Sequence, residues 1–126
     1  MNKIKIIVPA LNLNWEAELS ETPNAKELYN KLPLSGTVNR WGEEIYFSVA
    51  LDFPLEEGAK DEVALGDVGY WPPGKAICIF FGPTPISTKN KIIPASPVNI
   101  IGKVRSGVEL FHNVKAGTKI ILEKVD

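Results

Sequence analysis

The stretch GDVGYWPPGKAICIFFGPTP, residues 66–85, decides the fold. It holds two short apolar segments, Val68 to Trp71 and Ala76 to Phe81, on either side of a Pro-Pro-Gly turn. β-branched and aromatic residues favour strands, whereas proline and glycine interrupt them, so this stretch predicts two strands joined by the turn. The same pattern leaves aromatic side chains crowded around the turn.

Apolar residues alternate with polar ones on both sides of this stretch, which extends the β pattern through the chain. At the N-terminus Ile4, Ile6 and Val8 alternate with lysines. Side chains alternate between the two faces of a strand, so an alternating segment is a half-buried strand. In the segment Glu44 to Leu51, the side chains of Ile45, Phe47, Val49 and Leu51 share one face. The further predicted strands are Leu13 to Leu19, Gly36 to Trp41, Glu44 to Leu51, Val98 to Val104 and Thr118 to Val125.

Two short helical segments and one long loop separate these strands. Thr22-Pro23 combines a capping hydroxyl with a proline suited to a first helical turn, which predicts a helix as far as Leu32. Val108 to Asn113 can form a brief helical turn. Residues 82–97 contain three prolines and are expected to form a long loop.

The tally of about eight short strands favours a mainly β protein that forms a closed eight-stranded barrel with one or two short helices. Closure removes the exposed strand edges, and side chains can fill a barrel of that size. The chain has 126 residues, enough for one self-supporting core, so residues 1–126 are expected to form a single domain.

Composition argues against several classes of function. The formal net charge is -1 without a block of either sign, so nucleic acid is not an expected partner. No apolar run approaches the ~20 residues of a membrane span, and we expect a soluble, cytoplasmic protein that does not bind membranes. A single cysteine, Cys78, excludes an intrachain disulfide, and together with the single histidine, His112, it cannot supply a tetrahedral nitrogen-sulfur zinc site. An all-carboxylate metal site stays open, but no spacing of acidic residues indicates one. The chain has no glycine-rich phosphate-binding loop between a strand and a helix, so no nucleotide cofactor is expected. The oligomeric state cannot be read from the sequence.

Several motifs, in order, resemble the cyclophilins. Ile101-Gly102-Lys103-Val104, then Gly107 and Lys119 to Leu122, look like the last third of a cyclophilin. A closer resemblance is to the compact prokaryotic cyclophilin-like family of unknown function. That resemblance is carried by Leu32-Pro33-Leu34, Trp41-Gly42, Tyr46-Phe47, Gly66-Asp67, Tyr70-Trp71-Pro72-Pro73 and Phe80-Phe81-Gly82.

The departures from the cyclophilin pattern bear on activity. In cyclophilins an arginine beside the prolyl amide stabilises the twisted transition state, and the matching position here is Ser48. A hydroxyl lacks the charge and the rigid fork of a guanidinium, and losing such a donor costs a factor of ~100 or more in rate. The pocket tryptophan and histidine of cyclophilins fall at Ile93 and Val98, which leaves Phe81 as the retained pocket aromatic.

These features predict a noncatalytic module with a pocket that holds a small molecule or a short, Pro-containing peptide. The predicted lining is Tyr46, Ser48, Tyr70, Trp71 and Phe81. Rigid aromatic walls suit ligand binding, although Tyr70 and Trp71 could equally be core residues. The alternative is a weak peptidyl-prolyl isomerase in which Arg40 replaces the missing arginine. Amide hydrolysis, suggested by fold analogy alone, lacks a catalytic constellation.

Other candidate residues have structural interpretations. Trp41 is expected to plug one end of the barrel, and Asp67 to order the loop before its strand. His112 is expected at the surface, and Cys78 as a buried, unreactive thiol.

Overall fold

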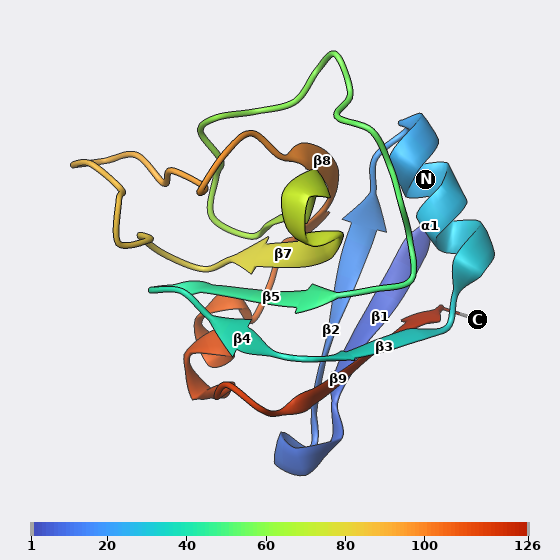
Figure 1. Cartoon of the computed structure of the whole chain (residues 1–126). Helices are drawn as coiled ribbons and strands as arrows, with labels where there is room; N and C mark the ends of the chain where they lie inside the picture. Colours follow the sequence, from blue (N-terminus) through green and yellow to red (C-terminus); the bar gives the residue numbers. More distant parts are fainter. Residues whose placement is uncertain (1, 126) are drawn as a thin grey trace.

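The computed structural model describes residues 2–125, in which alternating apolar residues build a nine-stranded antiparallel sheet curled into a nearly closed barrel (Figure 1). The strands are hydrogen-bonded in the order β3-β9-β1-β2-β8-β6-β7-β5-β4. Their bounds are β1 (Lys3–Val8), β2 (Leu13–Leu19), β3 (Leu34–Thr37), β4 (Asn39–Arg40), β5 (Glu44–Ser48), β6 (Asp67–Trp71), β7 (Ala76–Phe80), β8 (Asn99–Val104) and β9 (Lys119–Lys124).

The barrel closes because the two outermost strands, β3 and β4, follow each other in the chain. Only Val38 separates them, and its amide donates to the Thr118 carbonyl while its own carbonyl accepts from the Gly117 amide. β3 pairs with β9, whereas β4 pairs with β5. The strand predicted at residues 36–41 therefore changes partner at Val38 and forms two strands, which gives nine instead of eight.

The barrel interior holds the side chains of one parity along each strand. Phe47 and Ile45 of β5 are fully buried, and Val49 and Leu51 beyond the strand are buried on the same side. The same buried cluster contains Ile4, Ile6, Val8, Ile77, Ile79, Phe81, Ile120 and Leu122. Alternation identifies the inward face of a half-buried strand such as β1, whereas β7 is apolar on both faces and only the structure shows which face is inward.

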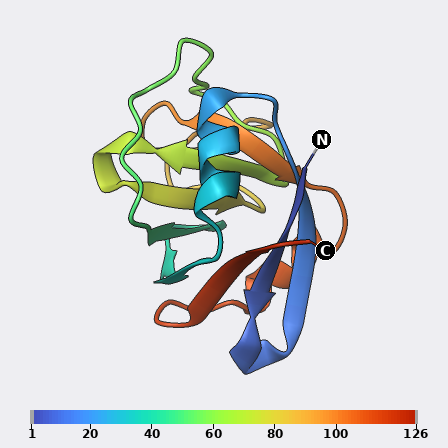
Figure 2. The same ribbon diagram turned by 90° about the vertical axis from the view of Figure 1, so that its right-hand side faces the viewer.

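Two helical segments pack against the barrel core. Figure 2 shows α1 (Pro23–Lys31), in blue and cyan, lying against one side of the barrel. The Thr22 hydroxyl caps this helix by accepting from the Ala25 amide at 3.3 Å, and Ala25 and Leu28 are fully buried. The 3-10 segment η3 (Val108–Asn113) buries Phe111, whose ring stacks on Trp15 with centroids 3.9 Å apart. Both segments contribute apolar side chains that complete the core.

The remaining 3-10 segments are short turns between strands. η1 (Pro9–Leu11) joins β1 to β2, and η2 (Pro72–Gly74) is the predicted Pro-Pro-Gly turn between β6 and β7. Within residues 2–125, no helix has the length and apolar character that crossing a membrane would require.

Candidate ligand-binding site

A second buried cluster lies on the outer face of β5, β6 and β7. Side chains that point away from a barrel normally meet water, but here two irregular segments, residues 60–63 and 82–98, cover them. These segments are joined by backbone pairing of Lys60 with Val98 and of Val63 with Ile92. The outer cluster comprises Val63, Cys78, Phe80 and Val98, with Tyr46, Trp71, Ile92 and Ile100 packed against it.

This cover leaves a cavity of about 280 Å³ between the sheet and the segment 82–98. β5 and β7 supply its floor through outward side chains, and Trp71 at the end of β6 supplies one wall. The full lining is Trp41, Glu44, Tyr46, Trp71, Cys78, Pro94, Ala95 and Val98.

The indole of Trp71 is held in place from two sides. Its Nε1 donates to the Ser96 hydroxyl at 2.7 Å, which ties the wall to the covering segment. Gly74 permits the ring to fold back over the turn, since a Cβ atom there would lie 2.7 Å from the ring carbons. The Tyr46 ring meets Trp71 edge-on, with centroids 6.4 Å apart and planes at 75°. Such an aromatic wall loses little freedom when a ligand binds.

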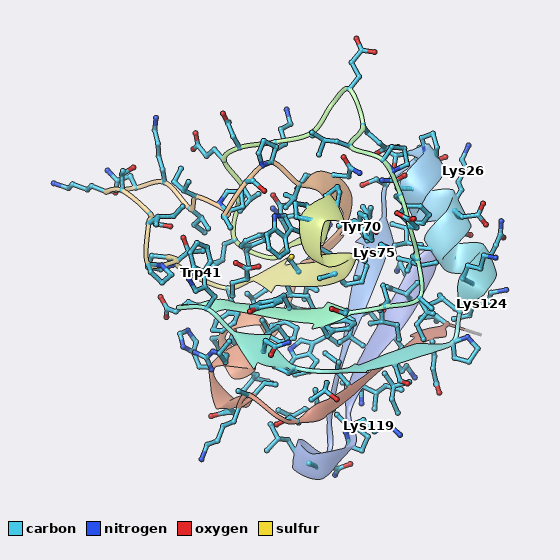
Figure 3. All side chains as sticks on the ribbon, viewed as in Figure 1. Lys26, Trp41, Tyr70, Lys75, Lys119 and Lys124 are labelled. Carbon is cyan, nitrogen blue, oxygen red and sulfur yellow. The ribbon has the colours of Figure 1, made fainter. Side chains whose placement is uncertain are left out.

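Trp41 reaches the cavity from a tight turn between β4 and β5. The Trp41 amide donates to the Glu44 carbonyl at 3.0 Å, and Gly42 adopts a left-handed conformation with φ of 61°. A Cβ atom on Gly42 would lie 2.8 Å from Pro85, so glycine also lets the covering segment approach. Figure 3 shows Trp41 beside that segment, at the end of β5. Trp41 thus lines the outer cavity instead of plugging a barrel end.

The covering segment, residues 82–98, has no regular secondary structure but is held together by internal hydrogen bonds. The Ser87 hydroxyl accepts from the amides of Thr84 and Ile93, at 2.9 and 3.0 Å. The Thr84 hydroxyl in turn donates to the Ile93 carbonyl. These bonds close residues 84–93 into a compact loop, which holds Pro94 and Ala95 at the rim of the cavity.

Glu44 places a carboxyl group inside this apolar cavity. The residue is only 6% exposed, and burial raises the pKa of its side chain from 4.5 to about 7. Desolvation penalises the charged form, and a hydrogen bond from the Cys78 thiol, which favours the carboxylate, offsets part of that effect. The cavity therefore contains an acid that titrates near neutral pH.

Cys78 is buried, as the sequence predicted, and the structure places it on the cavity floor beside Glu44. It is 2% exposed, and burial together with the neighbouring carboxylate holds the pKa of its thiol well above the usual value. A thiol that stays protonated is a poor nucleophile. Cys78 therefore acts as a small packing residue and as a donor to Glu44.

The five residues predicted to line one pocket divide between the two faces of the sheet. Tyr46 and Trp71 line the outer cavity. Ser48 shares their face but is exposed, and its hydroxyl donates to the Gly74 carbonyl at 3.1 Å outside the cavity lining. Tyr70 and Phe81 belong to the barrel interior and are 0% and 3% exposed.

Tyr70 and Phe81 have structural contacts inside the barrel. The Tyr70 hydroxyl donates to the Leu51 carbonyl at 2.9 Å and accepts from the Phe53 amide (the residue is labelled in Figure 3). Phe81 packs against Phe111 of η3, with centroids 6.0 Å apart. Both side chains have the parity of the inward residues on their strands, and that parity keeps them out of the outer cavity.

Arg40 also lies on the inner side of the sheet and away from Ser48. It is paired with Ile45, an inward residue, and its guanidinium lies 5.0 Å from the centre of the Phe81 ring. Its NH1 donates to the carbonyls of His112 and Val114, at 3.4 and 2.9 Å. These bonds fasten the end of η3 to the barrel, so the guanidinium is not positioned to replace the missing donor beside Ser48.

We expect Arg40→Ala to destabilise the protein by about 1–3 kcal/mol, because charged hydrogen bonds to two carbonyls and a cation–π contact are lost. Denaturant titration measures this loss. Arg105→Ala is the matched control, since Arg105 is the other arginine and makes an exposed ion pair with Glu18, which contributes little to stability. Equal losses in the two variants would contradict the structural role of Arg40.

The other predicted residues serve local structure. Asp67 accepts from the Ala64 amide at 2.8 Å, which orders the turn before β6, as expected. His112 on η3 is at the surface, and its Nε2 lies 3.2 Å from the Glu43 carboxylate. Among the residues that the structure describes, no group of three or more His, Cys, Asp or Glu side chains is arranged to hold a metal ion.

Glu44 is the functional candidate that sequence reasoning missed. A charged residue at the start of a strand, directly after a turn, resembles an ordinary exposed hairpin end. The alternation of side chains along β5 could have identified it, because Glu44 lies two residues before Tyr46 and therefore on the same outer face. Pro94 and Ala95 had no such signal, since the segment that carries them has no periodicity.

The fold and the cavity define a β-barrel protein with an aromatic-walled pocket on its outer surface. The chain belongs to the cyclophilin-like family: the family model described as Cyclophilin-like matches residues 2–123.

Two solved structures are similar to it. One is the solution structure of the hypothetical protein AF2241 from Archaeoglobus fulgidus, which is 41% identical in sequence and has a TM-score of 0.81. The match covers 98% of the present chain and 95% of the AF2241 chain. The other is the structure of McbB in complex with tryptophan, which is 16% identical in sequence and has a TM-score of 0.75. The match covers 96% of the present chain and 44% of the McbB chain, and it shows a similarity of fold alone. No curated protein matches the chain.

Proposed function

We propose that the protein is a noncatalytic binding module and that the outer cavity takes a small molecule or one side chain of a short peptide. The observation that carries this proposal is a preformed cavity, mostly apolar and walled by three aromatic residues, on the outside of a barrel whose interior is already filled. Ligand sites typically combine an apolar lining with a few placed polar groups. Glu44 is such a polar group.

The rigidity of the walls supports binding over simple packing. Trp71 is bonded to Ser96, and the loop that covers the cavity is closed by the Ser87 bonds. A site that is ordered before binding spends less conformational entropy on the ligand.

Tryptophan fluorescence can test this proposal because two of the three tryptophans line the cavity. We expect a saturable change in emission with at least one member of a panel of Pro-containing peptides and small metabolites. Tryptophan belongs in the panel because the similar McbB structure contains it, and it is followed by calorimetry because it is itself fluorescent. A folded protein that responds to no compound in either measurement would contradict the proposal.

Two single variants locate the binding site. Trp71→Phe should weaken binding about tenfold, because the Ser96 bond and part of the aromatic wall are lost together. Ile86→Ala is the control, since Ile86 belongs to the same covering segment but is 50% exposed and does not line the cavity. Equal effects of both substitutions would place the ligand elsewhere.

A protease-coupled assay with X-Pro peptides, run at high protein concentration, separates this proposal from the isomerase alternative. The Ser48 hydroxyl is already bonded to Gly74, and Arg40 lies on the other face. We therefore expect no rate enhancement. An enhancement that Trp71→Phe abolishes would show that the cavity is catalytic.

A further inference from the structure

The cavity combines three aromatic rings with one carboxyl group, and this combination has a specific chemistry. Trp41, Tyr46 and Trp71 supply the rings, and Glu44 lies on the floor between the strands. Aromatic rings present a negative face that attracts cations, and a carboxylate in an apolar site attracts them more strongly still.

We propose that this cavity binds a small organic cation, a quaternary ammonium ion or a protonated amine, with the ammonium group between the aromatic walls and the Glu44 carboxylate. The proposal rests on the proposed function of the cavity as a binding site and specifies the class of its ligand.

The first argument for a cationic ligand is the buried carboxyl group of Glu44. Within residues 2–125, it forms no ion pair with a lysine, arginine or histidine. A buried carboxylate without a cation is costly, and proteins normally pair such a group or leave it protonated. A ligand that brings a positive charge would satisfy the carboxylate, whereas an anionic ligand would meet repulsion.

The arrangement of the rings is the second reason. The Tyr46 and Trp71 planes stand at 75° to each other, so they form two walls of a corner instead of a flat stack. An ammonium group in such a corner can contact more than one ring, which is how aromatic cages recognise quaternary ammonium ligands. Two rings at this angle cannot sandwich a flat aromatic ligand as effectively as two parallel rings.

The charge inventory of the cavity makes the proposal sensitive to pH. Glu44 and Tyr46 face the cavity from β5 and Cys78 faces it from β7, while the lining from the covering segment, Pro94, Ala95 and Val98, is uncharged. The pKa of Glu44 is about 7, and burial holds the pKa of the Cys78 thiol well above its usual value. A cation requires the carboxylate, so its affinity should be constant above pH 7 and fall about tenfold per pH unit below it. A neutral hydrogen-bond acceptor would show the opposite trend, because it requires the protonated acid.

The test compares two ligands of nearly equal shape by isothermal titration calorimetry at pH 8. Choline carries a trimethylammonium group, and 3,3-dimethylbutan-1-ol carries a tert-butyl group in its place. We expect choline to bind at least tenfold more tightly, because cation–π and carboxylate contacts together are worth that ratio or more. 3,3-Dimethylbutan-1-amine, titrated in parallel, tests whether a protonated amine is preferred over the quaternary ion.

Glu44→Gln identifies the group responsible, because it removes the charge and keeps the shape. The variant should lose the pH dependence and most of the preference for choline, because only the cation–π contacts with the rings remain, while binding the alcohol as before. Glu43→Gln is the matched control: the neighbouring carboxylate pairs with His112 and does not line the cavity. If Glu44→Gln does not fold, the wild-type affinities at pH 5.5 and pH 8 decide, with tighter choline binding at pH 8 as the expected result.

The outcomes separate this proposal from the one on which it depends. Equal affinity for choline and the alcohol, or binding that is restricted to neutral compounds, would overturn the cation proposal and leave the cavity as a binding site. A preference for choline that Glu44→Gln leaves undiminished would also overturn it, because the ammonium group would then not contact the Glu44 carboxylate. If neither this series nor the peptide and metabolite panel binds, the proposed function itself fails.

Discussion

Phe47→Ala should destabilise the protein by about 3–5 kcal/mol. Phe47 is 0% exposed at the centre of the barrel, among the largest fully buried side chains. The backbone of Gly36 approaches it so closely that a Cβ atom there would lie 3.0 Å from the ring. A ring so enclosed leaves a cavity when it is removed, because strands on a closed barrel cannot move inward to fill the space.

Denaturant titration of the wild type and the variant measures this loss. Leu55→Ala provides the control, because it removes a similar apolar group from a residue that is 52% exposed and should change stability by about 0.5 kcal/mol or less. A Phe47→Ala loss below about 1 kcal/mol would show that the core around β5 can collapse.

Glu44→Gln should stabilise the ligand-free protein above pH 7, by up to about 3 kcal/mol. Burial raises the pKa of Glu44 from 4.5 in the unfolded chain to about 7 in the folded protein. Between these values the unfolded state releases a proton that the folded state keeps, so rising pH favours unfolding. Glutamine fills the same space without a charge and avoids this penalty.

The pH dependence distinguishes this mechanism from a general packing effect. Below about pH 4.5 the carboxyl group is protonated in both states, and the variant should match the wild type. The advantage of the variant should grow between pH 4.5 and 7 and then level off, as measured by urea titrations at pH 4, 6 and 8. A constant difference across this range would contradict the raised pKa. Glu43→Gln, at a partly exposed position, should not reproduce the trend.

Both predictions concern strand β5, whose two faces have different roles. Phe47 and its inward neighbours hold the barrel together, whereas Glu44 and Tyr46 face the outer cavity. The destabilising carboxyl group is thus located on the face that would gain from a ligand. Binding of a cation should remove the penalty, so choline is expected to raise the stability of the wild type more than that of Glu44→Gln.

The sequence by itself determined the barrel and most of its interior. Alternation, as of Ile4, Ile6 and Val8 with Lys3 and Lys5, selects the inward face because a strand shifted by one residue would turn these three apolar side chains to water and the lysines into the core. Tyr70 follows Val68 by two residues and Phe81 follows Ile79 by two, which places both inside the barrel with those inward neighbours.

Only the tertiary structure decided the site. The cavity exists because residues 82–98 fold back over β5 and β7, and that segment is held by long-range bonds such as Trp71 to Ser96. Irregular segments have no periodicity, so their partners cannot be read from local sequence. The same reason hid Glu44: a carboxyl group at a strand end is ordinary in water, and only the distant chain that covers it makes it a buried acid beside three aromatic rings.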